Sequence, residues 1–546
     1  MKESDENENV KKEVQNGVLL ESKYSLISKQ TLNQKDNVIW NILSSGRVPY
    51  EGLNEITIMN ILYQISSQNM CNSEKTVKIG ERESRIYSAF IRSKYLGFGH
   101  GVGRSGNLED AQPKSAGNAV LAKITTRMVK NLIKRFGIRS CEDVCILPYA
   151  TGMCLSTCLL YLKNIRKESE YVILSRIDHK TIYKCIDFCN LSCFIVDMIY
   201  ENDELYTDLH KIENLMKEYN TKVTCVMSIT SSYAPRNSDD IIKISHLCKK
   251  YNIPHVINNA FGLQCNYLCK EIQKCYDTNG RIDFVIQSCD KNLLLPVNGG
   301  IIFSNNKINM KGLKNYYPGR VPIHAYIDIF ITLLELGEKK IMELRLKREN
   351  NFIWLQNKIK LLCNKYNLSL IKNSKNKISM AINLNELYKY CDKENPRCIN
   401  LLGSMLFYRN VTGHKVICSP LLIQQEALKK RDTIEISDST EIKKTETQKD
   451  LINDNMSKEK NKETNIMNDI LLLNKKNILK IGNKTFPFFG TSYDLYPYSY
   501  IAFSCVIGID KTELQKFVDR LDDTIDYFIK KCQKKNKKEI KKEDAA

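Results

Sequence analysis

Short apolar runs alternate with helix-like segments between residues 144 and 304, and this alternation limits the fold more than any other feature of the sequence. The runs predict strands, because they are rich in β-branched and apolar residues and are bounded by small or polar ones. They cover residues 144–149, 171–174, 193–196, 223–228, 255–257, 282–288 and 301–304. Strands that alternate with helices predict an α/β fold with a mostly parallel sheet, which binds ligands at its strand ends.

A lysine loop separates the last two runs. Lys291 follows Ser288 by three residues, and an apolar turn and the pair Gly299–Gly300 precede residues 301–304. A lysine held just past a buried strand suits Schiff-base chemistry, because desolvation lowers the pKa of its amine and makes it nucleophilic. A surface lysine that snorkels over an apolar loop explains this stretch equally well.

Other strand ends also carry polar or small residues. Ala150, Thr151 and Gly152 form a tight turn before a helix, which suits a cofactor phosphate. His179 and Asn258 follow two further strands.

A glycine-rich segment, residues 97–106, precedes these strands and contains Arg104 and Ser105. Exposed amides beside a guanidinium can wrap a phosphate, although a long turn would show the same composition. Gln112 opens a segment that predicts a helix to about residue 136, whose N-terminus offers another anion site.

The expected organisation has six parts. A disordered or loosely helical N-terminus covers 1–35. A helical extension with the phosphate loop, suited to oligomer contacts, covers 36–110. The large domain covers 111–325, and a smaller C-terminal α/β domain combines 326–423 with 485–530. Its expected strands are 378–382, 405–408 and 416–418, and its last helix is 512–529. A low-complexity insertion, 424–484, and a basic tail, 531–546, complete the chain.

Composition favours a cytoplasmic protein with a polyanionic partner. No apolar run is long enough to span a bilayer, so we expect no membrane association. The 20 cysteines contain no CxxC pair, which favours reduced thiols over a metal site or a disulfide framework. The net charge of +20 suits RNA, although a general excess of Lys and Asn would also produce it.

The order of Thr151–Gly152, His179, Asn258 and Lys291 resembles the fold-type I pyridoxal-phosphate enzymes. The resemblance implies pyridoxal 5'-phosphate as the cofactor, held by these positions at its phosphate, ring face, ring nitrogen and aldehyde carbon, respectively. Most members have Asp where Asn258 stands. A neutral amide holds the ring proton less well, which favours chemistry with an easy leaving group.

Ten segments resemble one family more closely, the O-phosphoseryl-tRNA(Sec) selenium transferases. They are GERESRI, GHGVGRSGN, QPKSAGN, ATGM, RIDHK, APR, NNAFG, QSCDKN, YPGR and GSMLFYR. The resemblance implies a homotetramer that converts tRNA(Sec) carrying O-phosphoserine to selenocysteinyl-tRNA(Sec) with selenophosphate. Phosphate would leave by β-elimination, and selenium would add to the dehydroalanyl-tRNA.

The same resemblance implies roles for individual residues. Arg104, Ser105, Gln112 and Arg320 would bind the substrate phosphate, and Arg82 the cofactor phosphate. Lys180 would lie near the site, and Arg409 would contact the tRNA acceptor end. A second tRNA contact of the family is in doubt, because its position holds Thr278 here.

Two other functions remain open at this stage. A cysteine desulfurase or selenocysteine lyase of the same fold would need a mobile catalytic cysteine and would have no use for the phosphate loop. A non-catalytic tRNA-binding protein would not need the set of Lys291, His179 and Thr151.

Overall fold

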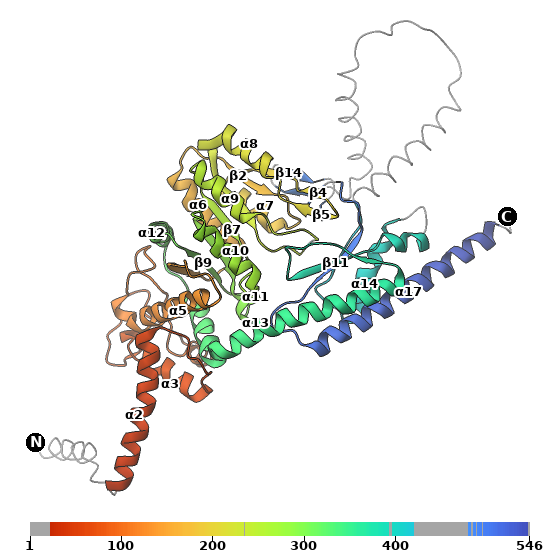
Figure 1. Cartoon of the computed structure of the whole chain (residues 1–546). Coiled ribbons are helices and arrows are strands. Elements are labelled where there is room, and N and C mark those ends of the chain that lie inside the picture. The colour runs from red at the N-terminus through yellow and green to blue at the C-terminus, as the bar shows by residue number, and fades with distance from the viewer. Residues whose placement is uncertain are drawn as a thin grey trace, which may run out of the picture. The chain divides into compact units, whose positions relative to one another are not determined.

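The computed structural model describes residues 22–233, 235–391, 396–419, 479–481, 484–486, 489–493 and 495–543 (Figure 1). Its contacts divide the chain into two compact units. The first combines Met1–Arg104, Asp110–Leu132 and Pro322–Ile341, and the second combines Ser105–Glu109, Ile133–Val321 and Met342–Ala546. We describe each unit by itself.

A seven-stranded sheet forms the centre of the second unit, in the order β1-β9-β8-β7-β6-β2-β3. Its strands are β1 (Asp143–Leu147), β2 (Tyr171–Ser175), β3 (Ser192–Val196), β6 (Val223–Ile229), β7 (His255–Asn258), β8 (Phe284–Ser288) and β9 (Gly300–Ser304). β9 runs antiparallel to both β1 and β8, and the other six strands share one direction. The mostly parallel sheet expected from the sequence is therefore confirmed.

Helices join these strands, so the polar loops at the strand ends lie along one edge of the sheet. The helices are α6 (Thr151–Ile165), α7 (Lys180–Phe188), α8 (Leu209–Tyr219), α9 (Ile241–Lys250), α10 (Asn266–Asp277), α11 (Cys289–Leu293) and α12 (Lys307–Tyr316). β6 to β9 are buried along their whole length, as expected for strands covered by helices on both faces. A short turn, η3 (Asn220–Lys222), and a hairpin of β4 (Ile199–Glu201) and β5 (Glu204–Tyr206) complete this part.

A second, antiparallel sheet belongs to the same unit, in the order β10-β11-β15-β12. Its strands are β10 (Ser369–Leu370), β11 (Ser379–Asn383), β12 (Lys415–Ile417) and β15 (Tyr500–Ser504). The helices beside it are α14 (Leu401–Tyr408), α17 (Lys511–Glu543), η4 (Asn385–Tyr390), η5 (Pro396–Asn400) and the later part of α13 (His324–Tyr366). Leu355, Leu406, Ile501 and Phe528 lie in their common core. β15 lies between β11 and β12, so chain from beyond the expected insertion completes this sheet.

Three segments differ from expectation. Residues 405–408 were expected to be a strand, but they end the helix α14, because Leu402 and Leu406 are buried four residues apart. Residues 22–35, expected to be disordered or loosely helical, begin the regular helix α2, which contains neither Gly nor Pro over its 24 residues. The last helix, expected to end at 529, continues to Glu543.

Most of the expected insertion, 424–478, lies outside the described residues. A hairpin of β13 (Leu479–Ile481) and β14 (Lys484–Phe486) follows it. Phe486 packs on Tyr183 of α7 with ring centroids 4.7 Å apart, so the chain resumes beside the large sheet.

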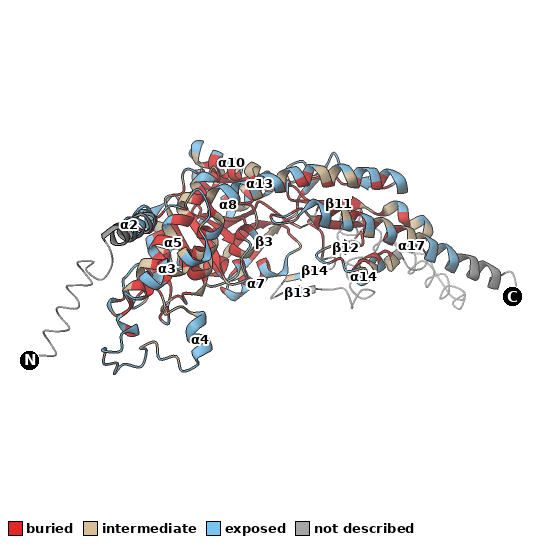
Figure 2. Ribbon diagram, turned by 90° about the horizontal axis from the view of Figure 1, so that it is seen from below, coloured by how far each residue is buried: buried red, intermediate tan, exposed pale blue. Residues whose placement is uncertain are grey.

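The first unit is helical. It contains α2 (Ser22–Ser45), α3 (Glu55–Ser66), η1 (Met70–Asn72), α4 (Ala89–Lys94), η2 (Pro113–Ser115), most of α5 (Ala116–Arg135) and the start of α13. Ile61, Leu62 and Ile65 of α3 are fully buried, whereas α4 has no buried residue (Figure 2). No helix among the described residues of either unit is long and apolar enough to cross a membrane.

Candidate functional site

Four of the expected site positions lie at one edge of the large sheet. Thr151 begins α6 after β1, His179 precedes α7 after β2, Asn258 ends β7, and Lys291 lies in α11 after β8. These four strands point in the same direction, so their carboxyl ends meet at this edge. The sequence order of the four positions thus becomes a cluster in space.

Backbone contacts hold the loop of Lys291. Asn292 donates from Nδ2 to the carbonyls of Ala260 and Ser288, at 2.9 and 2.8 Å. Gln264 donates from Nε2 to the carbonyl of Lys291 at 3.1 Å. Lys291 itself is exposed, as in the second of the two expectations for this stretch, because Cys289, Asn292 and Leu293 form the buried face of this short helix.

The ring of His179 lies close enough to Lys291 to respond to its charge. Neighbouring protein atoms partly desolvate its ring, although the residue remains exposed, and this desolvation lowers the pKa of His179. The positive charge of Lys291 lowers it further. The ring is therefore neutral at pH 7 and can pack on a flat, apolar ring.

Buried polar atoms without a partner mark the same edge. They are Thr151 Oγ1, Ser175 Oγ, Ser231 Oγ, Asn258 Oδ1 and Gln287 Nε2. Each is in or just after one of the strands β1, β2, β6, β7 and β8. A buried polar atom without a hydrogen bond costs about 1–3 kcal/mol, so this set indicates a polar ligand that completes it.

The set fits pyridoxal phosphate. Thr151 Oγ1 and the first amides of α6 are donors for a phosphate, and Asn258 Oδ1 is an acceptor for a ring N–H. A Cβ on Gly152 would lie 2.5 Å from Cγ2 of Thr181, so only glycine lets this turn approach the start of α7. Ala150, the N-cap of α6, has no side-chain cap that would compete for those amides.

The loop of Arg320 is linked to the cofactor turn. Tyr317 and Tyr149 hydrogen-bond through their hydroxyls, and their rings stack with centroids 6.1 Å apart. Tyr317 begins the YPGR segment, and Tyr149 directly precedes Ala150. Sequence reasoning missed this link, because 168 residues separate the two tyrosines.

A buried lysine holds the Ser105 segment in the same unit. Lys314 Nζ lies 2.8 Å from Glu109 Oε1 and 2.7 Å from Asp143 Oδ2. A Cβ on Gly106 would lie 3.7 Å from the carbonyl oxygen of Tyr317. Ser105 therefore belongs to a segment beside the loop of Arg320.

Arg82, Arg104 and Gln112 belong to the first unit. Arg82 and Arg104 are exposed, and Gln112 is buried. Within that unit, Lys114 pairs with Glu83 at 2.5 Å and thereby lowers the pKa of Glu83. This pair holds the segment after Arg82 against the one that follows Gln112.

Lys415 was also missed from the sequence. Its ammonium contacts the carboxylate of Asp178, a buried side chain next to His179. Burial lowers the pKa of Lys415 to about 8. A nearby carboxylate raises the pKa of a lysine, and the direct contact with Asp178 therefore favours an ionised pair. The sequence signal was Asp178 within RIDHK, a carboxylate at a strand end that needs a cation.

The remaining expected positions lie farther along the chain. Arg409 ends α14, donates from Nη1 to the carbonyl of Met405 at 3.2 Å and lies 5.1 Å above the ring of Tyr527. Lys180 is exposed and lies 6.0 Å from the ring centroid of Phe489. Thr278 is exposed and lies 2.9 Å from Nε2 of His246.

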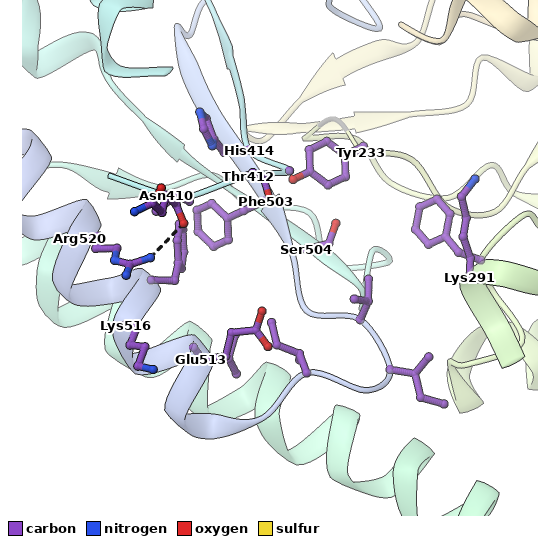
Figure 3. A pocket seen from close by; sticks show the side chains of 18 of the residues that line it. Tyr233, Lys291, Asn410, Thr412, His414, Phe503, Ser504, Glu513, Lys516 and Arg520 are labelled. Atoms are coloured by element: carbon purple, nitrogen blue, oxygen red, sulfur yellow. Dashed lines mark hydrogen bonds between the residues drawn. The ribbon is translucent and has the colours of Figure 1, made fainter. Parts of the chain in front are cut away.

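A pocket of about 570 Å³ opens beside Lys291 (Figure 3). Lys291 lies at one end, and Lys516 and Arg520 of α17 lie at the opposite end. Residues 410–414, which directly follow Arg409, line its side.

The sheet, the lysine after β8 and the edge of unpartnered polar atoms define a pyridoxal-phosphate-dependent enzyme of fold type I. Comparison with known proteins gives the particular family. Residues 66–526 match the family model of O-phosphoseryl-tRNA(Sec) selenium transferase, and the chain belongs to this family.

Relatives support the assignment along most of the chain. The O-phosphoseryl-tRNA(Sec) selenium transferase of Dictyostelium discoideum is 32% identical over 516 residues, which cover 92% of this chain and 96% of that protein. The one from Methanocaldococcus jannaschii is 35% identical over 318 residues, 58% of this chain and 72% of that protein. A crystal structure of an archaeal member superposes with a TM-score of 0.73 at 25% identity, covering 92% of this chain and 98% of that one.

Proposed function

We propose that this chain converts O-phosphoseryl-tRNA(Sec) to selenocysteinyl-tRNA(Sec), with pyridoxal phosphate as cofactor and selenophosphate as selenium donor. The observation that carries the proposal is the edge of the large sheet. There, Lys291, His179 and a set of unpartnered buried polar atoms lie together in a chain that matches this family.

The roles at the cofactor follow from the atoms that each residue offers. At the turn after Ala150, Thr151 Oγ1 and the amides of Thr151 and Gly152 would hold the phosphate. His179 would pack on the ring, and Asn258 Oδ1 would accept from the ring nitrogen. Lys291 would hold the cofactor through its amine and, as a free amine, would take the proton from Cα of the seryl group. Pyridoxal phosphate would supply an electron sink beside Cα, which eases the loss of phosphate from Cβ.

For the substrate phosphate we propose Arg320 and Ser105, which belong to the same unit as Lys291. The roles of Arg104, Gln112 and Arg82, which belong to the first unit, stay predictions from the family resemblance. A guanidinium forms two parallel hydrogen bonds to a phosphate dianion, and an unphosphorylated serine has no group to accept them. We assign the preference for phosphoserine to these contacts.

The alternative as a cysteine desulfurase or selenocysteine lyase lacks its nucleophile. Of the 20 cysteines, 18 are buried, and Cys398 and Cys532 are partly so. Burial raises the pKa of the thiols nearest the sheet edge, Cys154 and Cys289, well above the ordinary value. A buried, protonated thiol is a poor nucleophile, which counts against this alternative.

We also propose an oligomeric state, a tRNA contact and a cellular location for this chain. Val77, Ile79, Tyr87 and Phe90 of the first unit are 80–95% exposed, and apolar side chains gathered in one segment are commonly covered by another subunit. We propose that further copies of the chain cover them in a homotetramer, to be checked by light scattering. We assign Arg409 to the tRNA and the reaction to the cytoplasm, where free thiols persist.

Inorganic phosphate release from O-phosphoseryl-tRNA(Sec), without a selenium donor, tests the reaction. The unmodified protein should release phosphate, Lys291→Ala should release none, and Lys311→Ala, which removes an exposed lysine of α12, should behave as unmodified. Unchanged release by Lys291→Ala would refute the role of this lysine. Tight tRNA binding without any release would instead support the non-catalytic alternative.

A further inference from the structure

The pocket beside Lys291 contains side chains that the cofactor and the substrate phosphate do not use. It belongs to the second unit and extends from Lys291 to α17 (Figure 3). Its volume of about 570 Å³ is within the range of about 300–1,000 Å³ typical of pockets for small ligands. A ligand larger than a phosphate can therefore lie next to the catalytic lysine.

The lining is mainly aromatic and aliphatic. Phe503 is buried, and Phe517 of α17 packs on it with ring centroids 4.9 Å apart. Leu294 and Val506 remain 46% and 38% exposed. Large apolar side chains that stay open inside a concave site indicate a ligand with a flat or apolar part.

Cationic groups lie at the end away from Lys291. Arg520 donates from Nη1 to the carbonyl of Asn410 at 2.9 Å and so ties the 410–414 loop to α17. Lys516 is exposed at the same end, next to a single lining carboxylate on that helix, Glu513. Arg409 directly precedes this loop. An anionic chain that contacts Arg409 would thus meet more positive charge on its way to Lys291.

We propose that this pocket receives the 3′-terminal nucleoside of the tRNA, with its base stacked on Phe517 and its phosphate near Lys516 and Arg520. The inference rests on the proposed function, because the seryl group is esterified to that nucleoside and must reach Lys291. Aromatic side chains bind unpaired bases through their π-faces, and positive groups follow the backbone. The geometry satisfies both requirements within one pocket.

Binding of uncharged tRNA(Sec) to the full chain loaded with cofactor tests this site. Affinity is measured for the complete tRNA and for the same tRNA without its terminal nucleoside. In the unmodified protein the shortened tRNA should bind about tenfold more weakly, the lower part of the range for one stacked base. In Phe517→Leu, which keeps an apolar side chain against Phe503, the two tRNAs should bind within about twofold of each other.

Two matched variants complete the test. Phe517→Tyr keeps an aromatic face and should retain the tenfold difference, as should Phe188→Leu, which changes an exposed phenylalanine at the end of α7. A terminal 2-aminopurine should lose fluorescence on binding to the unmodified protein and keep it in Phe517→Leu. A tenfold difference that persists in Phe517→Leu, or none in the unmodified protein, would overturn the proposal. Lys291-dependent phosphate release from O-phosphoseryl-tRNA(Sec) is measured with the same protein preparations. A failure of the proposed function would therefore be recognised separately.

Discussion

Arg320 shows how one residue position is set by the backbone beside it. Gly319 has φ = +104°, in the left-handed region that favours glycine, and no atom lies within 4 Å of where its Cβ would be. The conformation of the turn, rather than crowding, thus requires glycine before the arginine. Tyr317 then joins this turn to Tyr149.

Arg320→Ala should lower phosphate release far more than it lowers cofactor content. A hydrogen bond to a charged group contributes about 1.5–3 kcal/mol, so we expect a loss of about ten- to a hundredfold in rate. Release and cofactor absorbance are measured on the same sample. Arg139→Ala, which changes an exposed arginine, serves as the control. Normal release by Arg320→Ala would show that this guanidinium does not bind the substrate phosphate.

His255 gives the second prediction for a single residue. Burial lowers the pKa of His255 to about 4, and the neutral ring lies 2.6 Å from Ser228 Oγ and 3.0 Å from the carbonyl of Arg281. In the unfolded chain the pKa is about 6.5. The unfolded state therefore binds a proton between these values that the folded state does not, and stability falls as pH drops below about 6.5.

Because of His255, the free energy of unfolding should fall by about 1.4 kcal/mol for each pH unit between pH 6 and pH 4.5. Urea titrations at several pH values measure it. His255→Gln cannot take up the proton, so its pH dependence should be flatter by that amount. Parallel curves for the two proteins would contradict a buried, neutral His255.

Gly337 shows how one glycine determines the kink in a long helix. It has φ = +66° inside α13, and the next two amides donate outside the helix, from Glu338 to Pro49 and from Lys339 to Tyr50, at 2.8 and 3.0 Å. A Cβ there would lie 2.6 Å from the backbone of Glu51 and Gly52. The kink in α13 therefore results from backbone pairing with residues 49–50.

Gly337→Ala should destabilise the protein by more than about 2 kcal/mol, because the left-handed conformation and the clash add. Gly137→Ala changes a glycine with φ = +105° and open space around it, so it measures the conformational term alone. Thermal unfolding compares the two variants with the unmodified protein. Equal shifts for both would mean that the contact with residues 51–52 does not matter.

The net charge of the whole molecule predicts how tRNA binding depends on salt. The chain has 82 basic and 62 acidic residues, and a net charge of +20 should make tRNA binding strongly dependent on salt. We expect the affinity to fall at least about tenfold between 50 and 200 mM KCl, because bound cations are released from the phosphates. Binding that does not change with salt would exclude a mainly electrostatic contact.

The sequence by itself determined the α/β class, the strand ends and the order of the site positions. Each of these follows from local patterns, since apolar runs of strand length predict strands and a parallel sheet gathers its polar ends at one edge. The loops of Thr151, His179, Asn258 and Lys291 were therefore located before the structure was known.

Tertiary structure decided what depends on contacts between distant segments. Residues 405–408 form a helix because the core selects the face of Leu402 and Leu406, and β15 enters its sheet from beyond the insertion. The Tyr149–Tyr317 and Lys415–Asp178 contacts join residues 168 and 237 positions apart, a pairing that no local pattern contains. Lys291 is exposed because its short helix buries the opposite face, and burial of this kind is set by packing rather than by sequence period.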